Sequence, residues 1–133
     1  MYEARTLGEF ELLSTHFGHV QFDPKDLTWV LVENFDLPPN FNRDYTELIM
    51  DLNKHYPLLP PQDFYLGKGL LRKGDRPGHY YETGFESKRF RKEGYAWYCL
   101  HIKSWKPNPY SMVEGDNLLT AAGAVYKALS SGW

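Results

Sequence analysis

The sequence predicts an α+β domain, in which helices are kept separate from one antiparallel sheet. Apolar residues recur with helical spacing near the start of the chain, over Thr6–His16, and near its end, over Asn117–Leu129. Between them, Leu27–Phe35 and Tyr45–Asn53 have the β-branched and aromatic composition of strands. Only a short loop joins these two strands, so we expect them to pair antiparallel and to form part of a meander.

Length and composition are those of a folded single domain over residues 1–133. A chain of 133 residues with 42% hydrophobic and 17% aromatic residues can form one core without a metal or disulfide. The formal net charge of −2 argues against nucleic acid as a partner, because a nucleic-acid-binding domain usually concentrates basic residues on one face.

The cysteine content predicts a cytoplasmic protein. Cys99 is the only cysteine and cannot form an internal disulfide, so a reducing compartment is expected. The first ten residues lack the basic and apolar segments of a secretory signal. No apolar stretch is long enough to span a bilayer, so we expect no membrane association.

The first helix is expected to bury an apolar face and to expose its acidic residues. Its apolar residues lie three or four positions apart: Leu7, Phe10, Leu13 and Phe17. Glu9 and Glu11 are predicted on the opposite, solvent-facing side. Gly18 stands where a helix commonly ends.

The middle of the chain predicts further strands and a rigid segment. Short strands are expected at His19–Phe22 and Phe64–Leu66. In Tyr45–Asn53, apolar and acidic residues alternate, which predicts one buried and one solvated face, with Asp51 on the solvated one. The three prolines of His55–Pro61 exclude regular structure there.

Residues 67–94 show no sustained periodicity. Within them, Lys88–Lys92 (K-R-F-R-K) is a basic cluster, which we expect to be a solvated loop. A third strand-like run, Tyr95–Ile102, then carries Cys99. The final helix is expected to be capped by Gly115 or Asp116 and to end at residues 130–132.

Three motifs in this order resemble the ubiquitin-conjugating enzyme family. Tyr56–Pro61 is similar to its Y-P-x-x-P-P signature, Cys99–Leu100 to its active-site C-L, and Trp105–Pro107 to its W-x-P. The helix over Asn117–Leu129 occupies the place of the family's central helix. The chain looks most like the divergent bacterial branch, without the two C-terminal helices of eukaryotic members.

This resemblance implies a transferase without a cofactor or a metal. Cys99 would accept a ubiquitin-like modifier as a thioester from a ThiF-type activating enzyme and pass it to an amine. A JAB-type isopeptidase from the same operon, in some cases an antiphage defence operon, is a further implied partner. The family also implies a cis bond at Pro60–Pro61. Its His-Pro-Asn tripeptide is missing, the nearest candidate being His79-Tyr80-Tyr81.

The residues themselves indicate what the chemistry needs. A carrier requires an accessible thiolate, and Lys103 is a candidate for a nearby positive charge. His101 lies two residues beyond Cys99 and shares its side if the segment is extended, so it is a candidate catalytic residue for the transfer to an amine.

Four alternatives remain open. Cys99 is a structural residue if the protein is a non-catalytic scaffold of the same fold that binds a ubiquitin-like protein. A zinc site from Cys99 with His55, His79 or His101 lacks paired ligand spacing. A Cys–His hydrolase lacks nucleophile-elbow glycines. Finally, the basic cluster suits a module that binds an acidic partner.

Overall fold

A computed structural model describes residues 2–131, which form two helices and one six-stranded antiparallel sheet. The elements in chain order are α1 (Glu3–Phe17), β1 (Val20–Phe22), β2 (Trp29–Asp36), β3 (Tyr45–Asp51), β4 (Asp63–Leu66), β5 (Tyr80–Tyr81), β6 (Ala96–Cys99) and α2 (Leu118–Ser130). The strands lie in the order β1-β2-β3-β4-β6-β5, and every pair is antiparallel. The predicted α+β class and the antiparallel pairing of β2 with β3 are confirmed.

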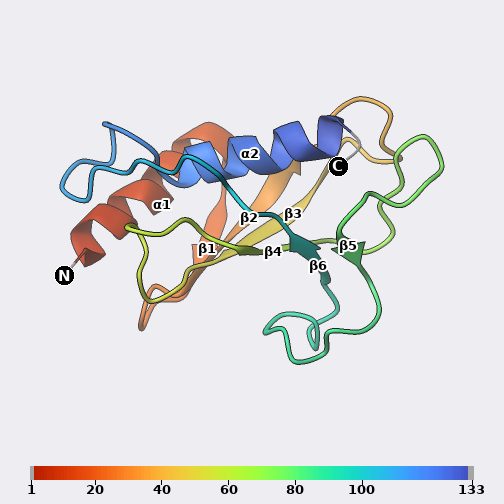
Figure 1. The fold of residues 1–133 in the computed structure, drawn as a ribbon, viewed down its shortest axis with the longest axis horizontal. Helices are drawn as coiled ribbons and strands as arrows, with labels where there is room; N and C mark the ends of the chain where they lie inside the picture. The colour runs from red at the N-terminus through yellow and green to blue at the C-terminus, as the bar shows by residue number, and fades with distance from the viewer. Residues whose placement is uncertain (1, 132–133) are drawn as a thin grey trace.

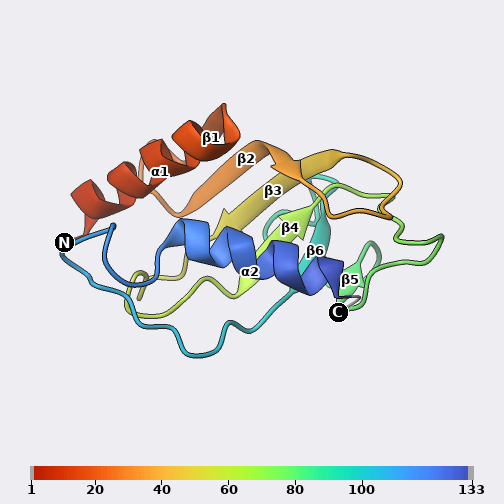
Figure 2. The same cartoon turned by 90° about the horizontal axis from the view of Figure 1, so that it is seen from above.

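Both helices lie on one face of the sheet, and the main core lies between them and the strands (Figures 1 and 2). Alternate residues of the strands point to this face, for example Val30, Met50 and Tyr98, which are fully buried. On α2, Ala121 and Val125 are also fully buried. Small residues on α2 allow the helix to pack closely against the sheet.

The other face of the sheet is covered by residues 82–95, which we call the strap. In Figure 1 the strap lies on the side of the sheet away from the helices. Phe90 of the strap packs on Tyr65 and Trp29, with ring centroids 5.1 and 5.8 Å apart. The expectation that one face of β3 is solvated is therefore wrong at Ile49, which is 1% exposed because the aromatic residues of this face shield it.

The strap also corrects the expectation for the basic cluster. Lys88–Lys92 is not a solvated loop, because Phe90 and Arg91 within it are only 6% and 8% exposed. The Arg91 guanidinium donates to the carbonyl oxygens of Gly84 and Tyr95, which ties the strap to itself. A glycine-rich stretch without periodicity thus forms an ordered cover.

The buried face of α1 differs from the prediction. Glu9 is fully buried, whereas Leu7 is 41% exposed. Burial of Glu9 is possible because its carboxylate accepts three hydrogen bonds, described below. Gly18 ends the helix as predicted, with a positive φ of 90°.

Three local expectations are also corrected. The N-cap of α2 is Asn117, not Gly115 or Asp116, because its side chain accepts from two backbone amides of the first turn while Thr120 bonds back to the Asn117 N–H. The cis peptide bond is Tyr56–Pro57 and not Pro60–Pro61. The helix ends at Ser130, and the predicted end at Gly132 lies outside the described residues.

Candidate functional site

Cys99 is the last residue of β6 and lies on the strap side of the sheet. Its neighbour across β4 is Asp63, and Trp97 precedes it on the same face. The strand ends at Cys99 instead of Ile102, and the side chain is half-buried. A half-buried thiol at the end of a strand packs against the sheet while leaving one side open to a partner.

His101 lies beside the thiol. Its Nε2 atom is 3.9 Å from the Cys99 Sγ, and its side chain is exposed. The spacing of two residues predicted this proximity, even though the chain leaves the sheet between them. An imidazole at this distance can exchange a proton with the thiol, or with a nucleophile that attacks an acyl carbon bound to the sulfur.

The glycine-rich loop brings His79 to the same place. Although His79 is twenty residues from Cys99 in the sequence, its carbonyl oxygen accepts a hydrogen bond from the Cys99 N–H at 3.0 Å. His79 has a φ of 57°, in the left-handed region. The His79 backbone therefore helps to hold the end of the strand that carries the thiol.

Two carboxylates lie in one row with Cys99, formed by residues that face each other on neighbouring strands. Asp63 is opposite Cys99 across β4, and Asp51 is opposite Asp63 across β3. Side chains of directly paired residues share a face, with Cβ atoms about 5 Å apart. The thiol and the two carboxylates thus form a line across three neighbouring strands.

The strap places two cations over this row. Lys88 Nζ is 3.2 Å from Asp63 Oδ1 and 4.5 Å from the centre of the Trp97 ring. Arg89 Nη1 is 3.5 Å from Asp51 Oδ1 and donates to Thr28 Oγ1. Since these two residues are engaged with the protein's own acidic side chains, the basic cluster gives little support to binding of an acidic partner.

Asp51 bears the clearest electrostatic signature in the row. Burial raises its pKa from the ordinary value of 3.8 to about 6, and the nearby Asp63 charge adds to the increase, whereas Arg89 and Lys88 oppose it. The folded protein therefore binds the Asp51 proton more tightly than the unfolded chain does. The free energy of unfolding contributed by this group falls as the pH rises from about 4 through about 6.

We expect Asp51→Asn to stabilise the protein at pH 7.5 by about 1 kcal/mol, because the full shift is worth up to about 3 kcal/mol and the partly exposed contact with Arg89 is lost. The gain should disappear near pH 4, where the folded protein already holds Asp51 protonated. Urea unfolding at both pH values measures the difference. Asp26→Asn, at an exposed carboxylate, is the control. An equal effect of Asp51→Asn at the two pH values would contradict this account.

The motifs around Tyr56 and Trp105 meet in space. The indole N–H of Trp105 donates to the Pro57 carbonyl oxygen at 2.8 Å, and the two aromatic rings are 6.2 Å apart. Within the proline segment, Leu58 and Leu59 are exposed. The segment that follows β6 is therefore anchored to the segment that precedes β4.

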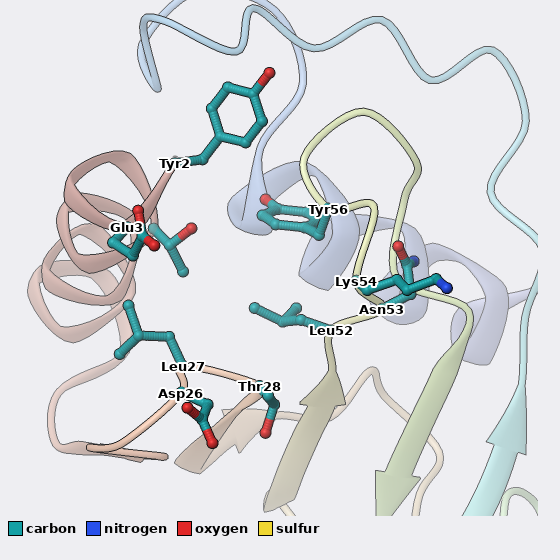
Figure 3. A pocket seen from close by; sticks show the side chains of 10 residues that line it. Tyr2, Glu3, Asp26, Leu27, Thr28, Leu52, Asn53, Lys54 and Tyr56 are labelled. Atoms are coloured by element: carbon teal, nitrogen blue, oxygen red, sulfur yellow. The ribbon is translucent and has the colours of Figure 1, made fainter.

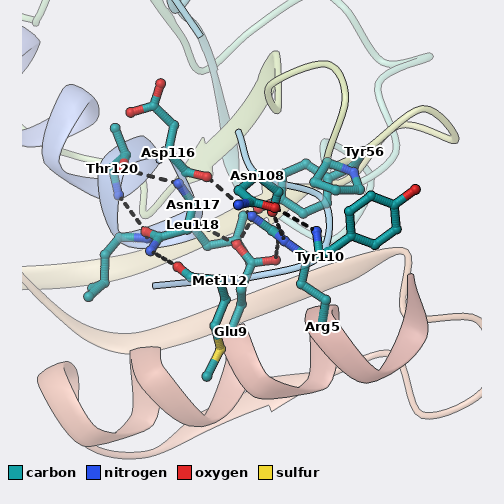
Figure 4. A network of polar contacts seen from close by, with 12 residues as sticks. Arg5, Glu9, Tyr56, Asn108, Tyr110, Met112, Asp116, Asn117, Leu118 and Thr120 are labelled. Carbon is teal, nitrogen blue, oxygen red and sulfur yellow. Dashed lines mark hydrogen bonds and ion pairs between the residues drawn. The ribbon is translucent and has the colours of Figure 1, made fainter. Parts of the chain in front are cut away.

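A buried carboxylate joins these loops to both helices (Figure 4). Glu9 accepts hydrogen bonds from Arg5 at 2.5 Å, from the Tyr56 hydroxyl at 2.5 Å and from the Leu118 N–H at 2.9 Å. The last of these places a carboxylate at the N-terminus of α2, where the helix dipole favours it. Burial raises the pKa of Glu9, against the lowering effects of Tyr56 and Arg5.

A cavity of about 450 Å³ lies elsewhere. It opens between the N-terminus of α1, the turn before β2 and the end of β3, and its lining is polar and apolar in similar measure, with Glu3, Asp26, Leu27 and Lys54 among the side chains (Figure 3). Cys99 does not line it. A smaller cavity of about 160 Å³ is lined by Asp51 and Asp63.

Within residues 2–131, no group of three or more His, Cys, Asp or Glu side chains is placed to hold a metal ion. Cys99 and the histidines considered with it, His55, His79 and His101, are therefore not arranged as a zinc site in the described part of the chain. Among these residues, no helix is both long and apolar enough to cross a membrane.

The sequence indicated that Cys99 and His101 lie close together, but it did not indicate that Asp63 and Lys88 lie on the same side of the sheet. Asp63 pairs with Cys99 only through strand register, and Lys88 meets Asp63 only through the folding back of the strap; neither stands near Cys99 in the sequence. Lys103, the predicted source of positive charge, is exposed in the loop after β6. Lys88 instead pairs with Asp63, the residue opposite Cys99 in the sheet.

Comparison with protein-family models, with curated proteins and with solved structures found no match to this chain.

Proposed function

We propose that this protein is a ubiquitin-conjugating-like transferase that carries a ubiquitin-like modifier as a thioester on Cys99. The observation that carries the proposal is a half-buried thiol at the end of a strand, with an exposed imidazole 3.9 Å from its sulfur. A carrier needs a thiol that a partner can reach and a proton-exchanging group beside it for the second transfer.

The surrounding scaffold supports the same proposal. The two sequence motifs that resemble the family's proline and W-x-P signatures are hydrogen-bonded to each other, which ties the chain after the Cys99 strand to the chain before β4. A scaffold that merely bound a modifier would have no need for an imidazole beside the thiol. The proposed partners are a ubiquitin-like modifier, a ThiF-type activating enzyme and a JAB-type isopeptidase, and the proposed setting is a bacterial conjugation system, in some cases one of antiphage defence.

The thiol environment also differs from that of the family. With the His-Pro-Asn tripeptide missing, the oxyanion that forms during transfer to an amine needs another donor. The exposed His101 imidazole, 3.9 Å from the sulfur, can donate such a hydrogen bond. It is the group we assign to this step.

The test is a loading reaction. The protein is mixed with a ThiF-type activating enzyme, its ubiquitin-like protein and ATP, and the products are separated on a non-reducing gel. An adduct that disappears on treatment with thiol supports the proposal. Absence of an adduct with the activating enzyme and modifier encoded beside this protein favours the non-catalytic scaffold.

We expect His101→Ala to separate the two chemical steps. Loading requires attack by a thiolate on an activated thioester, so its rate should stay near normal. Discharge to free lysine should slow by at least about tenfold, because a positioned acid or base contributes about 10²–10⁴-fold. Single-turnover loading and discharge assays measure the two rates.

The matched control is His55→Ala, an exposed histidine on the proline segment, which should alter neither rate. An equal loss in loading and discharge for His101→Ala would show that the histidine is structural and would remove it from the mechanism.

A further inference from the structure

Lys88 is the amine that the fold holds closest to the row of Cys99 and its carboxylates. Its Nζ atom lies 3.2 Å from Asp63, the cross-strand partner of Cys99, and 4.5 Å from the ring centre of Trp97. Trp97 stands two residues before Cys99 on the same face of β6. The ammonium group thus contacts one neighbour of Cys99 across the sheet, Asp63, and one along the strand, Trp97.

The placement is within reach of an acyl group on the sulfur. Cβ atoms of directly opposite residues are about 5 Å apart, and those of diagonal neighbours are about 7 Å apart. The Lys88 side chain, which is paired with Asp63, can therefore bring its amine to an acyl group on Cys99 by rotation about its own bonds. Lys88 is partly exposed, with 34% of its side chain accessible, and the strap need not unfold for it to move.

We infer that Lys88 is a self-modification site, which takes the acyl group from the Cys99 thioester. The inference rests on the proposed function for the origin of that acyl group. Asp63 is a positioning residue in this reaction, because it holds the amine beside the sulfur. The product is an isopeptide between the C-terminal carboxyl group of the modifier and the side chain of Lys88.

The transfer balances without any further reactant. The Lys88 ammonium loses one proton to solvent, and the free amine attacks the carbonyl carbon of the thioester. The carbon–sulfur bond breaks as the carbon–nitrogen bond becomes an amide. The departing Cys99 thiolate takes up the proton that the nitrogen gives off, so the thiol is regenerated.

Proximity predicts a strong preference for this lysine over others. A reaction between two groups held side by side is effectively unimolecular, and well-oriented cases reach very high effective concentrations. Lys92, in the same strap, is exposed, and no contact ties it to the Cys99 row. Lys103 follows Cys99 in the sequence and is exposed as well. These two lysines are internal standards for the reaction.

The test uses a small acyl thioester, the thiophenyl ester of N-acetylglycine, so that no activating enzyme or modifier is required. The full-length protein is incubated with this probe and treated with hydroxylamine to remove thioesters. Peptide mapping by mass spectrometry then locates the amide that remains. We expect at least about tenfold more amide at Lys88 than at Lys92 or Lys103.

Variants decide whether the acyl group travels through the thiol. Cys99→Ser should reduce the amide at Lys88 to the level found at Lys92, and Lys88→Arg, which keeps the charge facing Asp63, should leave no amide at that position. Lys92→Arg is the matched control and should leave the Lys88 signal unchanged. Asp63→Asn should lower the Lys88 signal several-fold while leaving acylation of Cys99, read without hydroxylamine, unaltered.

Acylation that fails at Cys99, stops there, or spreads equally over the exposed lysines overturns the inference. So does an amide at Lys88 that persists in Cys99→Ser. The loading reaction with activating enzyme and modifier is independent of the probe. A protein that relays the probe to Lys88 but never loads the modifier would refute the proposed function alone.

Discussion

Cys99→Ala is expected to abolish the thiol-sensitive adduct with the ubiquitin-like protein completely. The chain has no other cysteine, so no second thiol can substitute for it. Cys99→Ser should instead give an oxygen ester, which resists thiol reagents, or no adduct. The measurement is the loading reaction with activating enzyme, modifier and ATP, read on gels with and without dithiothreitol.

The effect must be separated from a loss of folding. The thiol is half-buried, and removing its sulfur leaves a small gap beside Trp97, so we expect Cys99→Ala to be destabilised by about 1 kcal/mol or less. Thermal melting of both variants gives this control. A thiol-sensitive adduct on Cys99→Ala would contradict the carrier mechanism outright, and the proposed function would fail with it.

The sequence predicted the elements of the fold better than the environment of their side chains. Strand composition located β2 and β3, and helical periodicity located both helices, because these signals are local. The burial of Glu9 has no local signal, since two of its donors, Tyr56 and Leu118, are 47 and 109 residues away. Periodicity therefore placed it wrongly on the solvated side.

The strap shows the same limit in a different way. Its glycines and charges carry no periodicity, so the sequence indicated a solvated loop. The aromatic Phe90 inside the charged run was the one available sign that the segment packs on something. The cap of α2 also had a readable sign, Asn117 with Thr120 three residues later, which is the spacing of a capping box.

In the candidate site, too, the sequence predicted the contact between residues that are close in the chain and not the contacts between distant ones. Cys99 and His101 are two residues apart, so their proximity follows from the geometry of an extended chain. Asp63 joins them only through the register of β4 with β6, and Lys88 only through the course of the strap. Contacts between distant segments bring Asp63 and Lys88 to the side of the sheet on which Cys99 lies, and a single sequence does not reveal these contacts.

Glu9→Ala is expected to destabilise the fold by about 3 kcal/mol, because it leaves a buried Arg5 without its ion pair and two further donors without an acceptor. For a chain of this size, such a loss lowers the melting temperature by about 10 °C. Thermal and urea unfolding near neutral pH measure the effect. The control is Glu11→Ala, at an exposed position on the same helix, with an expected change within about 0.5 kcal/mol.

A double-mutant cycle locates the origin of the loss. Tyr56→Phe removes one donor to Glu9, so its effect should be smaller in the Glu9→Ala background by about 1 kcal/mol. Additive effects would mean that Tyr56 and Glu9 stabilise the fold independently. In that case the carboxylate would not be the link between α1, the proline segment and the N-terminus of α2. A coupled pair instead makes Glu9 the group that links α1 to the proline segment and to the N-terminus of α2.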